Sequence, residues 1–99
     1  MDAQIIRLAK AAGLAARAER VLVFGSQARG DASPGSDIDL ALIVPDIVNR
    51  REALRAAIKA TSERKMPLDL VVLTHSTWTQ GRTLLARQIR QEGLMVYGN

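Results

Sequence analysis

The 99-residue sequence contains no cysteine, which excludes a disulfide framework and any metal site built on thiolates. It has no apolar run approaching the roughly 18 residues that a membrane-spanning helix needs. Its first residues lack the basic segment and the continuous apolar segment of a secretory signal. We therefore expect a soluble, cytoplasmic protein.

Aromatic residues are scarce as well, because Phe24, Trp78 and Tyr97 are the three in the sequence. Alanine supplies much of the 47% apolar share, so we expect a thin aliphatic core in a single domain over residues 1–99. Single-strand binders interleave several aromatic side chains with basic ones, so we interpret Trp78 and Tyr97 as packing residues.

Basic residues exceed acidic ones by 14 to 10, and the formal net charge is +4. This charge is compatible with an anionic partner but does not distinguish a nucleotide, RNA or an acidic protein. Arg51, Arg55 and Lys59 form a stripe at i, i+4 and i+8 of a predicted helix. We interpret the stripe as a solvated helix face, with a docking role as the alternative.

Apolar periodicity predicts helices that alternate with strands. Three helices are predicted: about 16 residues capped by Asp2, a helix from the cap Asn49 to about residue 64, and residues 82–92 stopped by Gly93. Four strands are predicted, at residues 21–24, 38–44 and 68–73 and, as a short edge strand, 94–97. Residues 74–79 are predicted to form a polar connection. The alternation predicts an α/β fold in which helices flank a small mixed sheet.

Asp37 and Asp39 lie at the start of the most apolar predicted strand, where burying a carboxylate is costly without a positive partner. Residues i and i+2 of a strand point to the same face, so the two charges repel each other. Mg²⁺ relieves this repulsion and prefers one or two carboxylates plus substrate phosphates. If the strand containing Asp69 is a neighbour, its carboxylate completes a site that can hold two metal ions.

A phosphate-binding turn is predicted directly after the first strand. Gly25 lets backbone N–H groups approach a phosphate closely, and the Ser26 hydroxyl adds a donor at a helix N-terminus. Arg29 is placed to neutralise a leaving pyrophosphate, with a structural salt bridge as the alternative. His75 has no other metal-binding residue beside it in the sequence and is interpreted as an ordinary surface histidine.

The spacing of these residues resembles a known signature. Gly25-Ser26, ten intervening residues and then Asp37-Ile38-Asp39 are similar to the Gly-Ser-x10-Asp-x-Asp pattern of the polymerase-β-like nucleotidyltransferase superfamily. Residues 25–40 and 90–97 resemble its small bacterial and archaeal branch, the minimal nucleotidyltransferases. The resemblance implies Mg²⁺-dependent transfer of AMP from ATP to a hydroxyl. Asp37 and Asp39 would be metal ligands, Asp69 a third ligand or the activator of the acceptor oxygen, and Gly25 and Ser26 the triphosphate site.

The resemblance also implies a partner. Members of this branch are often encoded beside an all-helical HEPN-domain ribonuclease toxin, which they neutralise by adenylylating it, typically on a tyrosine, or by binding it. Two alternatives stay open: an antitoxin that acts by binding alone, and a basic nucleic-acid-binding domain. Nucleic acid is not expected as a direct substrate, and both homo-oligomers and hetero-oligomers are compatible with the sequence.

Overall fold

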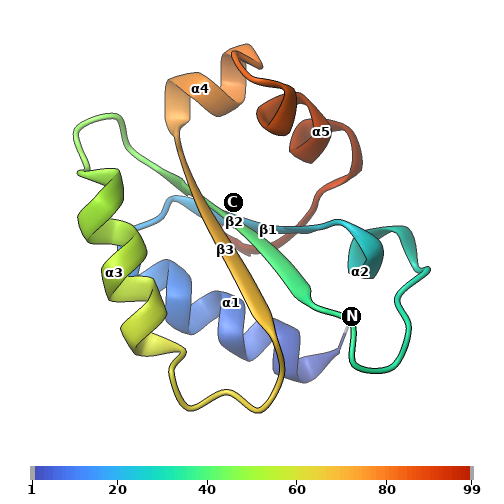
Figure 1. Cartoon of the computed structure of the whole chain (residues 1–99). Coiled ribbons are helices and arrows are strands. Elements are labelled where there is room, and N and C mark those ends of the chain that lie inside the picture. The colour runs from blue at the N-terminus through green and yellow to red at the C-terminus, as the bar shows by residue number, and fades with distance from the viewer. Residues whose placement is uncertain (1, 99) are drawn as a thin grey trace.

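The computed structural model describes residues 2–98, which form a four-stranded sheet with helices on both faces (Figure 1). The helices are α1 (Ala3–Ala16), α2 (Ser26–Arg29), α3 (Arg50–Ala60), α4 (His75–Gln80) and α5 (Leu84–Glu92). The strands are β1 (Arg20–Phe24), β2 (Ile38–Val44), β3 (Leu68–Thr74) and β4 (Leu94–Gly98). Their order is β3-β2-β1-β4, with β2 and β3 parallel and the other two pairs antiparallel. The predicted α/β fold with a small mixed sheet is confirmed.

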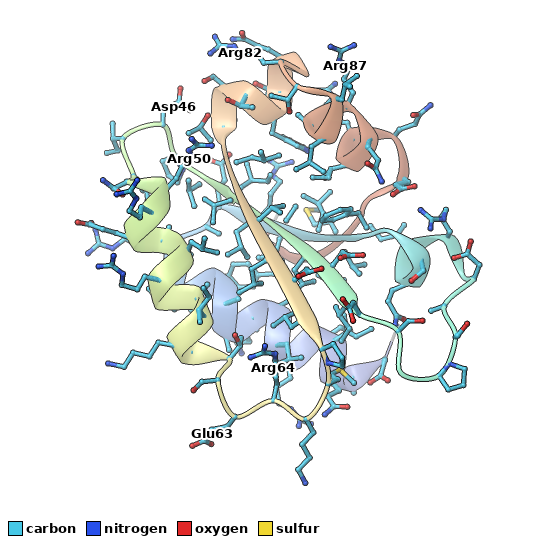
Figure 2. All side chains as sticks on the ribbon, viewed as in Figure 1. Asp46, Arg50, Glu63, Arg64, Arg82 and Arg87 are labelled. Carbon is cyan, nitrogen blue, oxygen red and sulfur yellow. The ribbon has the colours of Figure 1, made fainter. Side chains whose placement is uncertain are left out.

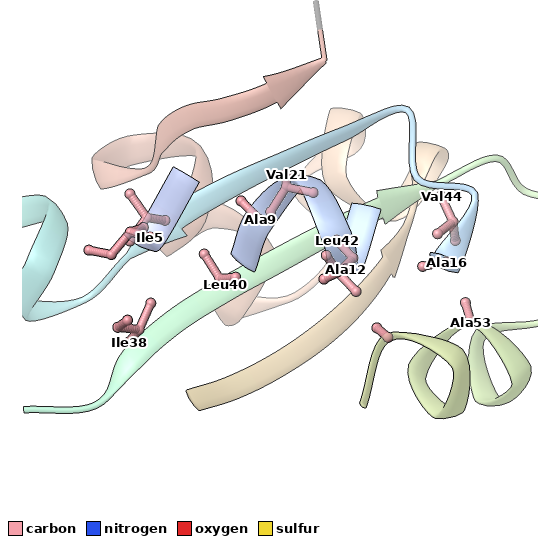
Figure 3. Close-up of a cluster of buried hydrophobic side chains, with 12 residues drawn as sticks. Ile5, Ala9, Ala12, Ala16, Val21, Ile38, Leu40, Leu42, Val44 and Ala53 are labelled. Carbon is pink, nitrogen blue, oxygen red and sulfur yellow. The ribbon is translucent and has the colours of Figure 1, made fainter. Parts of the chain in front are cut away.

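The core has two layers because strand β2 is apolar on both faces. Ile38, Leu40 and Leu42 are buried on the face covered by α1 and α3 (Figure 3). Ala41 and Ile43 alternate with them and are buried against α4 and α5 on the other face. The alternation fixes which face each residue of β2 presents, including the acidic residue near its start.

Two predicted helix caps are confirmed, and one predicted helix end is wrong. The backbone N–H of Gln4 donates to Asp2 Oδ1 over 2.7 Å, and that of Glu52 donates to Asn49 Oδ1 over 3.0 Å. Helix α3 ends at Ala60 and does not continue to residue 64. Thr61, the buried residue that follows, donates its hydroxyl to a carbonyl of the last turn, and such back-bonding competes with continuation of the helix.

The polar connection predicted over residues 74–79 is also wrong, because most of it is helix α4. Thr74 caps this helix by accepting from the N–H of Thr77. The Asp46 carboxylate accepts from the N–H of Ser76 over 2.9 Å. Both interactions satisfy donors of the first turn that have no partner inside the helix. The second comes from a residue 30 positions earlier, so no local sequence pattern signals it.

Helix α5 begins at Leu84, two residues later than predicted, because Thr83 caps it and accepts from the N–H of Ala86 over 3.0 Å. It ends at Glu92, immediately before Gly93, as predicted. Within residues 2–98, no helix has the length and apolar character that a membrane crossing requires.

Trp78 and Tyr97 pack against the core layers, and His75 lies on the surface. Trp78 packs against the core layer beneath α5, and Tyr97 packs against the layer beneath α1, so both interpretations as packing residues are confirmed. The Arg20 guanidinium lies 4.8 Å from the centroid of the Trp78 ring. His75 is half-exposed on α4, and its Nδ1 contacts the Glu19 carboxylate.

Candidate active site

The structure brings the three predicted aspartates to one face of the sheet. Strands β2 and β3 are parallel neighbours, as expected, and Asp39 lies directly opposite Asp69 in their register. Val71 and Leu73, which alternate with Asp69 along β3, pack into the core layer beneath α4 and α5. Because side chains alternate along a strand, Asp39, Asp69 and the preceding Asp37 share this face, at the end of the sheet where β2 and β3 begin.

The pKa of Asp39 is shifted by its burial and by the charges around it. Asp37 and Asp69 are exposed, whereas Asp39 is partly buried. Burial raises the pKa of Asp39 above its ordinary value, and the nearby negative charges of Asp69 and Asp37 raise that pKa further. Arg29 acts in the opposite direction. A bound cation would offset both the burial and the repulsion, so the electrostatics of the cluster favour one.

The donor set is suited to a hard divalent cation such as Mg²⁺, which takes carboxylate oxygens together with phosphate oxygens. In the described part of the chain, however, no three carboxylate or imidazole groups converge tightly enough to form a metal site as they stand. The side chains of Asp37 and Asp69 are exposed and would have to turn toward Asp39 for all three to contact one ion. Three carboxylates on one face of the sheet suit a Mg²⁺ ion. Binding of the ion would bring the Asp37 and Asp69 side chains toward Asp39.

Gly25 packs directly against the cluster. It has φ 72° and ψ −151°, a conformation that is essentially restricted to glycine. A Cβ atom added here would overlap Asp39 Oδ2 and lie 3.3 Å from Asp39 Cγ. The turn after β1 therefore leaves no room for a side chain between Gly25 and the Asp39 carboxylate. Ser26 begins the short helix α2 beside it.

Glu92 is a site residue that no sequence pattern indicated. Its carboxylate accepts from the Gly25 N–H over 3.0 Å, from Arg29 Nη1 over 3.2 Å and from Gln88 Nε2 over 2.9 Å. These hydrogen bonds, led by the one from Gln88, lower the pKa of Glu92. Gly25 and Glu92 are 67 positions apart, so the sequence carries no local signal for the contact.

Arg29 forms salt bridges with two carboxylates, Glu92 and Asp31, the second over 3.3 Å. Its hydrogen bonds to Asp31 and Glu92 raise its pKa. The structural salt bridge considered for Arg29 is therefore present. A phosphate that approached the turn would compete with the Glu92 carboxylate for the same guanidinium.

Replacing Asp39 by asparagine is expected to stabilise the metal-free protein. Because folding raises the pKa of Asp39, the wild-type protein loses stability as the pH rises through the folded-state pKa. Removing a like charge directly opposite Asp69 should raise the free energy of unfolding at pH 7 by about 0.2–1 kcal/mol. Urea titrations in EDTA at several pH values test this. The difference between variant and wild type should vanish below the ordinary carboxyl pKa, and an unchanged difference there would contradict the explanation.

Most of the chain matches the model of a known protein family. A model of the nucleotidyltransferase domain family matches residues 6–96. The chain therefore belongs to the nucleotidyltransferase domain family, as the Gly-Ser and Asp-x-Asp spacing indicated. A comparison with curated protein sequences gave no match.

Three solved structures resemble the chain over 97% of its length. The first, a toxin-antitoxin with AMP-PNP, is 25% identical, with a TM-score of 0.65 and 72% of that chain covered. The second, a toxin-antitoxin MntA-HpeT mutant in which two aspartates are replaced by glutamate, is 22% identical, with a TM-score of 0.62 and 71% covered. The third, a putative nucleotidyltransferase from Sulfolobus solfataricus, is 21% identical, with a TM-score of 0.60 and 85% covered. The last two establish the shared fold.

Proposed function

We propose that this chain transfers AMP from ATP to a hydroxyl group of a toxin protein and thereby acts as an antitoxin. The observation that carries the proposal is the register of β2 and β3, which sets Asp39 opposite Asp69 beside the Gly25–Ser26 turn. Two further observations support it: the family match over residues 6–96, and the similarity to a toxin-antitoxin with AMP-PNP, an analogue of ATP.

The proposed reaction is a displacement at the α-phosphorus of ATP. The acceptor oxygen forms a bond to that phosphorus while the bond to pyrophosphate breaks, and the hydroxyl proton passes to Asp69 or to water. Mg²⁺ held by Asp37, Asp39 and Asp69 would neutralise phosphate charge and lower the pKa of the acceptor hydroxyl. Gly25, Ser26 and Arg29 would hold the triphosphate, and Arg29 would have to leave Glu92 to do so.

The acceptor protein follows from the resemblance to minimal nucleotidyltransferases. On that resemblance, the partner is a HEPN-domain ribonuclease toxin, and the hydroxyl is that of a tyrosine. Asp69 is exposed and lies on β3, an outer strand of the sheet, so a residue on a second protein can reach it.

Mass spectrometry tests the proposal. The purified chain is incubated with labelled ATP, Mg²⁺ and the protein encoded beside it, and the intact mass of both proteins is measured. We expect the neighbour to gain the mass of one or more AMP units, and we expect no gain with the Asp37→Asn/Asp39→Asn variant.

The same experiment separates catalysis from binding. A stable complex that forms without any mass change, and that protects cells equally well with the Asp37→Asn/Asp39→Asn variant, would refute the transferase proposal. Neutralisation by binding alone would then explain the data.

A further inference from the structure

A groove lies beside the cluster, between α3 and the outer edge of β3. It has a volume of about 280 Å³. Four of its lining residues are apolar and three are polar: Leu54, Ile58, Leu68 and Leu70, and Thr61, Arg64 and Asp69. Ile58 is 51% exposed, which is high for a large aliphatic side chain. Asp69 lines the groove from β3, and the outer edge of β3 separates the groove, on the α3 face of the sheet, from the Asp69 carboxylate on the opposite face.

One wall of this groove is a strand edge with free backbone groups. Strand β3 is the outermost strand next to β2, so one of its edges has no neighbour in the described sheet. The Ile38 N–H donates to the Pro67 carbonyl over 3.0 Å, which sets the parallel hydrogen-bonding pattern. In this pattern Asp69 directs its backbone groups toward β2. Leu70 and Val72 therefore direct their N–H and C=O groups outward, toward solvent.

The other wall of the groove carries a concentration of positive charge. Residues 50–65 contain six basic and two acidic residues, an excess equal to the net charge of the whole chain. Leu54 and Ile58 form a row along the surface of α3. Ala53 and Ala57, on one side of this row, are buried. At 100° per residue, the basic stripe falls on the other, solvent side of that row. The stripe consists of Arg51, Arg55 and Lys59.

Figure 2 shows where this charge lies in the fold. Arg50 lies at the start of α3, and Arg64 lies between the end of α3 and the start of β3. Arg64 is the basic residue that lines the groove, and Arg50 lies at the opposite end of α3. The Arg64 guanidinium donates to the Thr61 carbonyl over 3.1 Å, which holds it at the groove end nearest Asp69.

We propose that this groove, which we call the α3–β3 groove, binds an extended acidic segment of the acceptor protein. The segment would add to β3 as a fifth strand and pair with the outward N–H and C=O groups of Leu70 and Val72. On the face toward α3, its apolar side chains would cover Leu54 and Ile58 and its acidic side chains would reach the basic stripe. On the opposite face, a hydroxyl-bearing residue in register with Asp69 would lie beside the Asp69 carboxylate, at the reaction site. This inference rests on the proposed function for the hydroxyl transfer, but docking itself needs no nucleotide.

The probe is a synthetic peptide that, as an extended strand, carries β-branched and acidic residues on one face and a single central tyrosine among uncharged polar residues on the other. A matched peptide carries lysine in place of every acidic residue. Binding to the full chain is measured without nucleotide by fluorescence anisotropy, and the contacted residues are located from backbone amide chemical shifts. We expect the acidic peptide to bind at least about tenfold more tightly than the lysine peptide. The largest shifts should lie in residues 54–61 and 68–74.

Two variants test the two walls separately. Val72→Pro removes one outward N–H from an edge strand, where proline is tolerated, and should weaken peptide binding by about tenfold or more. The triple variant Arg51→Glu/Arg55→Glu/Lys59→Glu should reverse the preference and favour the lysine peptide. Arg82→Glu/Arg87→Glu makes the same kind of charge reversal on another exposed surface (Figure 2) and should leave binding unchanged. Circular dichroism confirms that each variant is folded.

The outcomes separate docking from catalysis. Transfer to the tyrosine is tested by adding ATP and Mg²⁺ and measuring the mass of the peptide, which should increase by one AMP unit. Binding at residues 68–74 without transfer supports the groove and counts against the proposed function. Transfer to a protein acceptor that is unaffected by both groove variants supports the function and overturns the groove. Absence of peptide binding, equal binding of both peptides, or shifts confined to the other sheet edge at β4 would also overturn the groove.

Discussion

Replacing Asp69 by asparagine is expected to lower the rate of AMP transfer by about 10²–10⁴-fold, the range typical for loss of a positioned acid or base. The fall in affinity for ATP should be smaller than the fall in rate, with Asp37 and Asp39 still present to hold Mg²⁺. The reason is the position of Asp69 on the outer strand, exposed and away from the Gly25 turn. It is therefore placed to act on the incoming hydroxyl. Single-turnover rates and equilibrium ATP binding, both measured with Mg²⁺, give the two quantities.

The control for this variant is Asp46→Asn. Asp46 follows the opposite end of β2, and an asparagine there can still accept the hydrogen bond from Ser76. It makes the same change of charge and should leave transfer within about twofold of wild type. If Asp69→Asn weakened ATP binding as strongly as it slowed transfer, Asp69 would serve mainly as a ligand for the metal–nucleotide complex.

Replacing Gly25 by alanine is expected to damage both stability and activity. The residue has φ 72°, and strain of this kind costs about 1–3 kcal/mol. The new Cβ would also push Asp39 away from the turn. Displacing a reacting group by about 1 Å can cost about 100-fold in rate, so we expect at least that loss of transfer. Urea unfolding and single-turnover kinetics measure the two effects.

Gly30→Ala separates backbone strain from the contact with Asp39. Gly30 has φ 80°, but no atom lies within 4 Å of an added Cβ. It should therefore lose stability through strain alone and keep transfer within about threefold of wild type. If both glycine variants lost activity equally, the contact between Gly25 and Asp39 would not be the cause.

Much of the fold could be predicted because its signals are local. Strand β2 is apolar at nearly every position, which a strand buried on both faces requires. The i, i+2 spacing of Asp37 and Asp39 is itself enough to predict that both carboxylates share one face of the sheet. The position of β3 at an edge of the sheet, with partly exposed side chains, was not predicted. Its pairing with β2 was an assumption that the register confirms.

The features that could not be predicted depend on residues far apart in the sequence. Helix α4 is supported by Asp46, which lies 30 positions before the helix residue that it contacts. Glu92 reaches the Gly25 turn only because β1 is central and α5 packs on the adjacent face of the sheet. No pattern of propensity or periodicity within a short window records such contacts, because tertiary structure creates them.

The hydrogen bond between Gly25 and Glu92 also has a consequence for protein synthesis. The Gly-Ser turn and all three aspartates leave the ribosome before Glu92 does, and β1 gains its second neighbour only when β4 has been made. Until then the turn lacks the Glu92 carboxylate, which accepts hydrogen bonds from the Gly25 N–H and from the Arg29 guanidinium. A nascent chain stalled before residue 92 would thus contain every residue of the motif without the contact that orders it. Maturation of the site is therefore tied to the synthesis of α5 and β4.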